Sequence, residues 1–436
     1  MRLFLSVILL LVVDGLAAQQ IISLQEVLSV GLENNYSIRL VRNRQQISSN
    51  NHSLGHAGFL PSLDFRGQYS GTRTHTDRTG FDGETSSLRG IHNTNANAGL
   101  SLGWTIFDGF RVQTTYERLS VLKEIGELNT QAAIEHLVAG ITAEYFNLIQ
   151  QQRLLDNLRF AVELSRERVR IDEERFLLGS GSKLQLLQAE VFLNADSSRM
   201  GRQEEVVRAS RVRLNELMAM DDLRLNIQPR DTTILINDIL ILESLETAAM
   251  QNNVFLRLAD KNIRISEFDK RIIHSRTLPY VNLSSGYGYT RNTFQTGAFS
   301  DQQSFGMNYG ITLGVNLFDG LEQRRRRSNA ILEIENHRLM AEETEMAVRA
   351  DLITTYNIYL NNLRLMEMET QNLSVAYETL EIAMERYRLG ALSGIELREV
   401  QQNLLDAEER LLSIQYQTKL AEISLLRISG RILIYL

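Results

Sequence analysis

Apolar and polar side chains alternate at every second position in four segments of this chain. These segments are residues 63–69, 96–106, 281–289 and 307–317. Leu, Ile, Val, Met and aromatic residues dominate one set of positions, and Asn, Ser, Gly and Thr dominate the other. A period of two places successive side chains on opposite faces of a β-strand. We therefore predict four strands in two consecutive pairs, each with one apolar and one polar face.

The polar face of these strands favours a membrane barrel over half of a soluble β-sandwich, which the alternation alone also allows. Its side chains are small and mostly uncharged, as suits a water-filled lumen, and about 10 residues is the length of a tilted membrane strand. Four strands cannot close a barrel, because about eight is the minimum, so several chains would have to share one. Aromatic residues lie toward the strand ends that precede the helices, where an interfacial girdle would sit: Trp104, Phe107, Tyr309 and Phe318.

Helical periodicity surrounds each pair of predicted strands. Amphipathic helices are predicted at residues 23–57 and 241–276. Each one stops at a Leu-Pro step, because proline cannot continue a helix and biases its predecessor to extended conformations. After the strands, Asp108-Gly109 and Asp319-Gly320 could each form a hairpin turn. The helical pattern that follows favours Asp as an N-cap, with Gly easing the bend from strand to helix.

Two very long helical hairpins are predicted after the strand pairs. Residues 109–179 contain no proline, and a continuous helix of that length would extend about 100 Å. Apolar stripes at three- and four-residue steps run through residues 137–162 and 348–366. Such stripes are typical of long helices packed side by side. Helical periodicity resumes after the glycines at 179–181 and 390–394, so these segments are predicted to be the hairpin turns.

The whole order of elements occurs twice. Pro61 recurs 218 residues later as Pro279, whereas Gly179 recurs 211 residues later as Gly390. Similarity at a fixed offset is typical of a repeated structural unit. Pro229, which lies between the two units, is interpreted as part of a linker.

The offset between the repeats changes by 7 residues between the proline motif and the Phe-Asp-Gly motif. A length difference is tolerated most easily in an exposed loop. We therefore predict loops at residues 71–94 and 291–304. Strand direction places both loops opposite the helices, and so outside the cell if the strands cross an outer membrane.

The N-terminus has the features of a secretory signal peptide. Arg2 precedes an apolar run at residues 3–13, and Gly15, Ala17 and Ala18 follow it. That run of about 11 residues is shorter than the ~20 that a membrane-spanning helix needs. We divide the chain into three parts, namely a signal peptide at 1–18, a first repeat at 19–230 and a second repeat at 231–436.

Composition excludes several classes of function. The chain has no Cys, which rules out disulfides, thiolate metal sites, cysteine nucleophiles and a lipid-modified N-terminal cysteine. A formal net charge of −7 argues against a nucleic-acid partner. No nucleophile–base pair or metal-ligand pattern is evident, so we expect neither an enzyme nor a bound cofactor.

The paired motifs resemble those of the TolC family of outer-membrane efflux ducts, over essentially the whole mature chain. They are Leu-Pro-Ser at 60–62 and Leu-Pro-Tyr at 278–280, Phe-Asp-Gly at 107–109 and 318–320, and aromatic-x-x-Gly at 176–179 and 387–390. The resemblance implies a fold that combines all-α segments with a membrane β-barrel. Three identical chains would share one barrel in the outer membrane, and their helical hairpins would form an α-barrel across the periplasm.

The resemblance also implies a function. The protein would be the passive exit duct of a tripartite efflux or type I secretion system, fed by a periplasmic adaptor and an inner-membrane pump. The alternative from a different class is an exported coiled-coil scaffold or adhesin without a pore.

The family places functional residues at and just after the glycine turns. The resemblance implies a periplasmic entrance ring made of Glu396, Glu399, Gln185, Gln188 and Tyr387. It also implies adaptor-docking tips at Leu178, Gly179, Ser180, Gly181, Leu389, Gly390, Ala391 and Leu392. The family often has a basic residue where this chain has Leu392, so a salt-bridged lock of that kind is not expected.

Two charged patterns have alternative interpretations. Glu396 and Glu399 lie on one side of a helix, and they could be a solvated face rather than a ring. A glycosidase pair is disfavoured, because no cleft or substrate-stacking platform accompanies them. The run of arginines at 324–327 could be a solvated helix face, a contact with anionic lipid headgroups or a basic patch inside the duct.

Overall fold

The structure is a computed structural model that describes residues 20–237 and 239–436, so the signal peptide expected at 1–18 lies outside the described residues. The chain forms two compact units. Of the described residues, the hairpin unit comprises those up to Asn43, Leu128–Leu258 and Ala341–Leu436, and the sheet unit comprises Arg44–Glu127 and Ala259–Met340. Each unit therefore contains segments of both sequence repeats. None of the described helices combines the length and hydropathy needed to cross a membrane.

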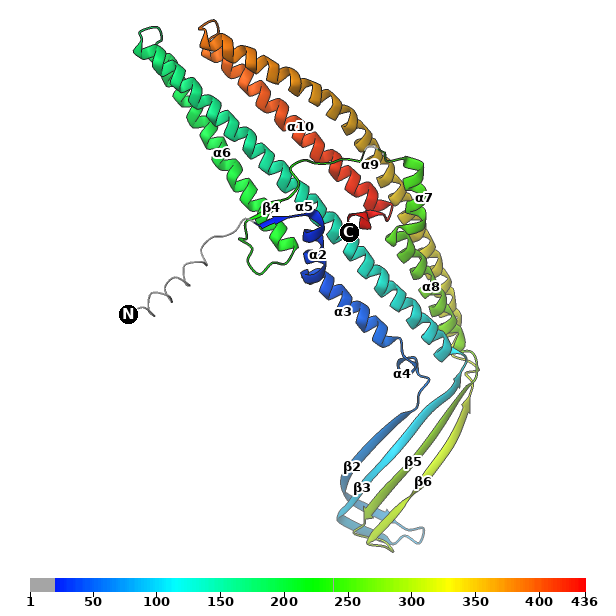
Figure 1. Cartoon of the computed structure of the whole chain (residues 1–436). Helices are drawn as coiled ribbons and strands as arrows, with labels where there is room; N and C mark the ends of the chain where they lie inside the picture. The colour runs from blue at the N-terminus through cyan, green and yellow to red at the C-terminus, as the bar shows by residue number, and fades with distance from the viewer. Residues whose placement is uncertain (1–19, 238) are drawn as a thin grey trace, which may run out of the picture. The chain divides into compact units, whose positions relative to one another are not determined.

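Four antiparallel strands make up the sheet of the sheet unit, in the order β2-β3-β5-β6 (Figure 1). The strands are β2 (Ser62–Thr79), β3 (Thr85–Asp108), β5 (Tyr280–Thr293) and β6 (Asp301–Gly314). The prediction of two strand pairs is confirmed. However, β6 ends at Gly314, so the expected continuation of this strand to residue 317 is wrong.

The pairing register sorts the side chains of the sheet into apolar and polar rows. Phe65 pairs with Leu100, Leu100 with Tyr287, and Tyr287 with Met307. One step along the strands, Arg66 pairs with Gly99, which pairs with Gly288. Because paired residues point to the same face of a sheet, one face is apolar from edge to edge. The other face carries glycine and polar side chains.

The predicted loops at 71–94 and 291–304 are wrong in extent, because the strands continue through most of them. Only residues 80–84 and 294–300 connect the strands. The first hairpin has the longer strands, so the 7-residue difference between the repeats lies in strand length rather than in an irregular loop. Thr-rich sequence near Thr79 suits strands, but it lacks the apolar alternation by which strands were recognised.

Each strand pair is followed at once by a long helix, α5 (Arg111–Leu177) or α9 (Glu322–Arg388). Asp108 Oδ1 accepts the backbone N–H of Val112 at 3.1 Å, and Asp319 Oδ2 accepts that of Gln323 at 3.0 Å. The aspartate side chains therefore cap the helices as predicted, although they do so from two residues before the N-cap positions, which Phe110 and Leu321 occupy. Gly109 has a left-handed φ of 71°, and a Cβ there would collide with the carbonyl oxygen of Ser275, so only glycine fits this bend.

Two helical hairpins follow, in which α6 (Lys183–Leu217) returns alongside α5 and α10 (Gly394–Ile428) returns alongside α9 (Figure 1). Both long helices have 67 residues and both return helices have 35. A 67-residue helix is about 100 Å long. The predicted hairpins are confirmed, and so is the glycine turn at 179–181, whereas the second turn is shorter than predicted because Gly394 already belongs to α10.

The helices that precede the strands are broken, contrary to the expectation of one continuous helix in each repeat. The first segment contains α2 (Leu24–Asn34), α3 (Tyr36–Asn51) and α4 (Leu54–Ala57), and the second contains α7 (Leu242–Asn252) and α8 (Val254–Ser275). The equivalent asparagines Asn35 and Asn253 cause the main break. Asn35 Oδ1 accepts the N–H of Ser37, and its Nδ2 donates to the carbonyl of Leu217 at 2.9 Å.

Asn253 makes the same contacts in the second repeat. Its Oδ1 accepts the N–H of Phe255, and its Nδ2 donates to the carbonyl of Ile428 at 2.9 Å. Each asparagine thus starts one helix and satisfies a carbonyl at the end of a return helix, where no intrahelical partner exists.

The segment between the repeats is held against the hairpin unit rather than free. The short strand β4 (Ile227–Pro229) pairs in parallel with β1 (Gln20–Ile22). Tyr145 OH donates to Asp231 Oδ2 at 2.8 Å beside this pair. Pro229 therefore belongs to a paired strand, and its interpretation as linker is wrong. The chain ends in the 3₁₀ helix η1 (Ile432–Tyr435).

Candidate functional site

Each hairpin turn is closed by a glycine in the left-handed conformation, which L-residues other than glycine adopt only with strain. The φ angles are 75° at Gly179 and 76° at Gly390. The N–H that follows each glycine donates back to the preceding helix, from Ser180 to the carbonyl of Arg175 at 2.9 Å in the first turn. This pattern satisfies helix C-terminal carbonyls. Leucine precedes each glycine, and both of these side chains, Leu178 and Leu389, are 82% exposed.

The other residues of the predicted docking tips divide by exposure. Ser180, Ala391 and Leu392 belong to the turns, and Leu392 is partly buried while the other two are exposed. Gly181 is required for a different reason from Gly179, because a Cβ on it would lie 2.9 Å from the Cβ of Arg175. The turn segments therefore present a narrow backbone edge with leucine side chains projecting from it.

Two predicted ring residues, Glu396 and Gln185, also start the return helices. Glu396 Oε2 accepts the N–H of Ser393 at 2.8 Å, while Ser393 Oγ accepts the N–H of Glu396 at 3.3 Å. Gln185 and Ser182 make the same reciprocal pair in the first hairpin. Such a capping box ends the turn and fixes the helix start. Hydrogen bonds from Ser393 hold the pKa of Glu396 below its usual value, so it is ionised at neutral pH.

Two more of the five predicted ring residues, Glu399 and Gln188, lie one turn further along the return helices. Glu399 is exposed and Gln188 is partly buried. Glu399 has no ion-pair partner within the described ranges of the chain. Glu396 and Glu399 are therefore two exposed carboxylates on the first turns of α10.

Tyr387 is not on the surface but joins the two hairpins from within. Its side chain is 2% exposed, and its hydroxyl donates to Asp172 on α5. The guanidinium of Arg175 stacks over its ring, 4.8 Å from the centroid, and donates to its carbonyl. Burial, and then the hydrogen bond to Asp172, raises the pKa of Tyr387 to about 12, so it remains a neutral donor.

A buried arginine lies beside this tyrosine. Arg168 Nε is 3.9 Å from Asp172 Oδ2, and its guanidinium is 4.9 Å from the ring centroid of Phe192 on α6. A Cβ on Gly394 would lie 2.5 Å from Arg168 Nη2. Gly394 is the first residue of α10 rather than part of the turn, and its missing side chain makes room for this arginine.

A second buried contact ties the return helices together. Arg398 on α10 donates to both carboxylate oxygens of Asp196 on α6, at 2.6 and 2.8 Å. Ser165 on α5 donates to the same carboxylate at 2.6 Å. Asp196 has no exposed surface, and Arg398 also stacks on Phe192 at 5.1 Å. Three helices from the two hairpins thus meet on one carboxylate.

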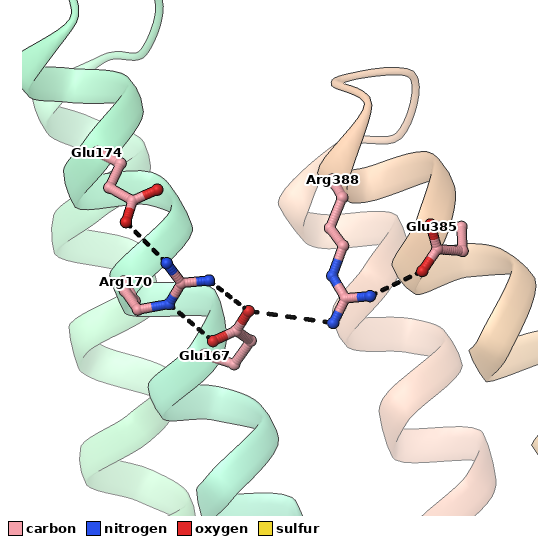
Figure 2. A network of polar contacts seen from close by, with 5 residues as sticks. All are labelled: Glu167, Arg170, Glu174, Glu385 and Arg388. Carbon is pink, nitrogen blue, oxygen red and sulfur yellow. Dashed lines mark hydrogen bonds and ion pairs between the residues drawn. The ribbon is translucent and has the colours of Figure 1, made fainter.

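On the outside of the same region, an exposed network links α5 to α9 (Figure 2). Arg170 bonds both Glu167 and Glu174, with distances of 2.7 to 2.9 Å. Arg388 bonds Glu385 at 2.7 Å and lies 4.0 Å from Glu167. Exposed pairs of this kind contribute about 0–1 kcal/mol each, so the buried contacts dominate the junction between the hairpins.

The buried charges of this junction were not predicted, although the repeats contain a signal for them. Asp172 and Asp196 occupy positions where the second repeat, 211 residues later, has Ala383 and Ala407. Both alanines are buried. A carboxylate at a position that is apolar core in the other copy indicates a buried polar contact, because an unpaired charge there would be costly.

The sequence matches a family model described as outer membrane efflux protein, over residues 27–219 and 247–431. The chain belongs to this family. As an outer membrane efflux protein it is an outer-membrane channel and not an enzyme, and the expected resemblance to the TolC family is confirmed. Among curated proteins, none matches the sequence.

Solved structures of outer-membrane channels share the fold. The Campylobacter jejuni CmeC outer membrane channel has 18% identity and a TM-score of 0.77, over 94% of this chain and 85% of that one. The Vibrio cholerae outer membrane protein VceC has 15% identity and a TM-score of 0.74, over 93% and 96%. The open-state Neisseria gonorrhoeae MtrE outer membrane channel has 14% identity and a TM-score of 0.73, over 93% and 88%. The predicted fold class is confirmed, and with it the alternative of a soluble sandwich is excluded.

Proposed function

We propose that this outer membrane efflux protein is the passive exit duct of a tripartite efflux or type I secretion system, assembled from three copies of the chain. The observation that carries the proposal is a four-stranded sheet whose outer strands β2 and β6 have free edges. Unpaired backbone groups are costly in lipid. Pairing β2 of one copy with β6 of the next would remove every edge and give one barrel of twelve strands.

The two faces of the sheet support this arrangement. The apolar row that contains Phe65, Tyr287 and Met307 is exposed in the single chain, and lipid would cover it. The opposite face carries small and polar side chains, with Asn95 Nδ2 donating to Asn292 Oδ1 at 2.6 Å. In a barrel this face would line a water-filled lumen.

The hairpin turns are proposed to dock a periplasmic adaptor that is coupled to an inner-membrane pump. Gly179 has no atom within contact distance of an added Cβ, so a partner could approach its backbone closely, and Leu178 and Leu389 offer exposed apolar anchors. A photoreactive amino acid at Leu389 should cross-link a periplasmic protein in whole cells. The same residue at Tyr309 on the apolar face of the sheet should not.

The entrance itself is proposed to lie at the first turns of the return helices. Three copies of Glu396 and Glu399 would bring six carboxylates near one axis, with Gln185 and Gln188 at the equivalent places in the first hairpin. The buried contact of Tyr387 with Asp172 would hold the two hairpins of each copy together while the entrance is closed.

Oligomeric state and conductance test the proposed duct together. The purified chain should be a trimer that requires detergent, migrates as a trimer in SDS without boiling, and conducts ions in a planar bilayer. A monodisperse water-soluble monomer would refute the proposed three-chain duct.

A further inference from the structure

A pocket of about 640 Å³ lies in the sheet unit, where helices meet the ends of strands. Its walls come from the start of α5, the last turns of α8 and the first turns of α9. Gly109 in its lining directly follows β3, and Leu278 precedes β5 by two residues. The pocket is therefore fixed to the same end of the sheet from which the helices start.

The charges around this pocket are predominantly positive. Lys270, Arg271, Arg327 and Arg338 line it together with only two carboxylates, Glu267 and Glu335. Arg338 lies 3.8 Å from Glu267, and Arg271 lies 3.7 Å from Glu117. Lys270 and Arg327 form no ion pair with any residue in the described part of the chain. Two cations on facing helices are thus available to an anionic group.

The arginines of the run at 324–327 differ in their contacts. Glu322 bonds both Arg325 and Arg326 at 2.7 Å, and hydrogen bonds from Arg325 and then Arg326 lower the pKa of Glu322 to about 2. These two arginines are therefore neutralised by a carboxylate that stays ionised. Arg327 belongs to the pocket wall instead.

The pocket also has an apolar side. Phe110, Leu278, Ile331 and Ile334 are part of the lining. Ile334 is buried, whereas Phe110 and Ile331 are about half exposed. A small soluble anion would use the cations and leave this surface in water. A ligand that has an anionic head and a hydrocarbon chain would use both.

We propose that this pocket binds an anionic phospholipid, with its phosphate between Lys270 and Arg327 and its hydrocarbon against Phe110 and Ile331. The inference rests on the proposed duct, in which the sheet spans the outer membrane. The strand ends at Asp108 and Tyr280 would then mark the membrane boundary on the helical side, which is the depth of lipid phosphates. Cationic clusters at this depth bind anionic headgroups.

Native mass spectrometry of the full-length detergent-solubilised protein tests the proposal, with phosphatidylglycerol, phosphatidylcholine and inorganic phosphate as separate probes. The intact protein should retain phosphatidylglycerol in preference to phosphatidylcholine, and inorganic phosphate at equal concentration should not displace it. The double variant Lys270→Gln/Arg327→Gln should bind phosphatidylglycerol at least tenfold more weakly. Ile331→Asn should also weaken the binding of phosphatidylglycerol, although it leaves Lys270 and Arg327 in place.

The matched control is Arg264→Gln/Arg324→Gln, which removes the same charge from exposed positions of the same two helices outside the pocket. It should bind phosphatidylglycerol like the unmodified protein. Equal weakening in both double variants, or displacement by inorganic phosphate, would overturn the proposal in favour of general charge attraction or a free-anion site. Loss of the trimer only in the pocket variant would show that a second copy of the chain fills the pocket. Failure of the unmodified protein to form a trimer would instead count against the duct itself.

Discussion

Removing the carboxylate of Asp196 should destabilise the junction between the two hairpins. The burial of Asp196 and its hydrogen bonds indicate the size of the free-energy loss. Asp196 is fully buried and accepts two hydrogen bonds from Arg398, whose side chain is 13% exposed. Breaking a buried ion pair by deleting one partner costs about 3–5 kcal/mol, because the other charge stays unpaired. Partial access of water to Arg398 places Asp196→Ala near the lower end, at about 3 kcal/mol.

Hydrogen exchange of the amides in α6 and α10 measures this loss as a local opening free energy. A loss of about 3 kcal/mol corresponds to roughly 100-fold faster exchange, since 1.4 kcal/mol is a factor of ten. The matched control is Glu216→Ala on the same helix. It breaks the Arg213–Glu216 pair, which is equally short at 2.7 Å but 57% and 59% exposed. That variant should cost no more than about 1 kcal/mol.

A double variant separates pairing from packing. Asp196→Ala/Arg398→Leu gives each position the residue that the other repeat has there, since Ala407 and Leu187 are the counterparts. With no buried charge left unpaired, most of the lost protection should return. If Asp196→Ala exchanges no faster than Glu216→Ala, or if the double variant is as unprotected as the single one, the buried pair does not hold the hairpins together.

The remaining predictions concern topology, turn strain, the entrance and pH. A cysteine at Thr296 should react with an impermeant reagent on whole cells, because the connection between β5 and β6 is expected to lie outside the cell. The chain has no other cysteine, so labelling reports this position alone, and labelling only after the outer membrane is breached would invert the topology. Gly390→Ala should destabilise its turn by about 1–2 kcal/mol, because φ is +76° there, and unchanged exchange of the turn amides would contradict this. Glu396→Gln/Glu399→Gln should fold normally, since glutamine fills the same capping box in the first hairpin, and single-channel recording should show weaker cation selectivity and weaker block by multivalent cations. Burial raises the pKa of Glu408 above 4.5, so this group favours the folded state less as pH rises through that pKa; Glu408→Gln should flatten the pH dependence of the melting temperature above pH 4.5, and an unchanged profile would refute this.

The elements that could be predicted from sequence are those that have an apolar side and a polar side. Alternation located the strands because one face of the sheet is apolar, and stripes located the long helices because one side of each is packed. Where both sides meet water, as near Thr79, the alternation disappears and the strand end could not be found. Asn35 broke a helix for a reason outside its own segment, since its partner, the carbonyl of Leu217, lies 182 residues away in sequence.

The site was predictable only where the two repeats agree. Gly179 and Gly390 share a left-handed φ, and Gln185 and Glu396 share a capping role, so the comparison of repeats located the turns. The two buried carboxylate contacts that join the hairpins, at Asp172 and Asp196, depend instead on differences between the repeats. Periodicity cannot show such a difference, because it registers whether a position is apolar and not which distant residue it faces.

In both of these contacts, the first hairpin supplies the carboxylate and the second hairpin supplies the hydrogen-bond donor. The carboxylates Asp172 and Asp196 belong to the first hairpin, and their partners Tyr387 and Arg398 belong to the second. The counterparts of these four residues in the other repeat are Ala383, Ala407, Phe176 and Leu187. None of these counterparts has a side chain that could form the reverse hydrogen bond, so neither contact could form between two copies of the first repeat or between two copies of the second. The junction within one chain is therefore specified by divergence of the repeats. The aromatic-x-x-Gly motif that recurs in both hairpins carries a hydroxyl only in the second, where Asp172 accepts its hydrogen bond.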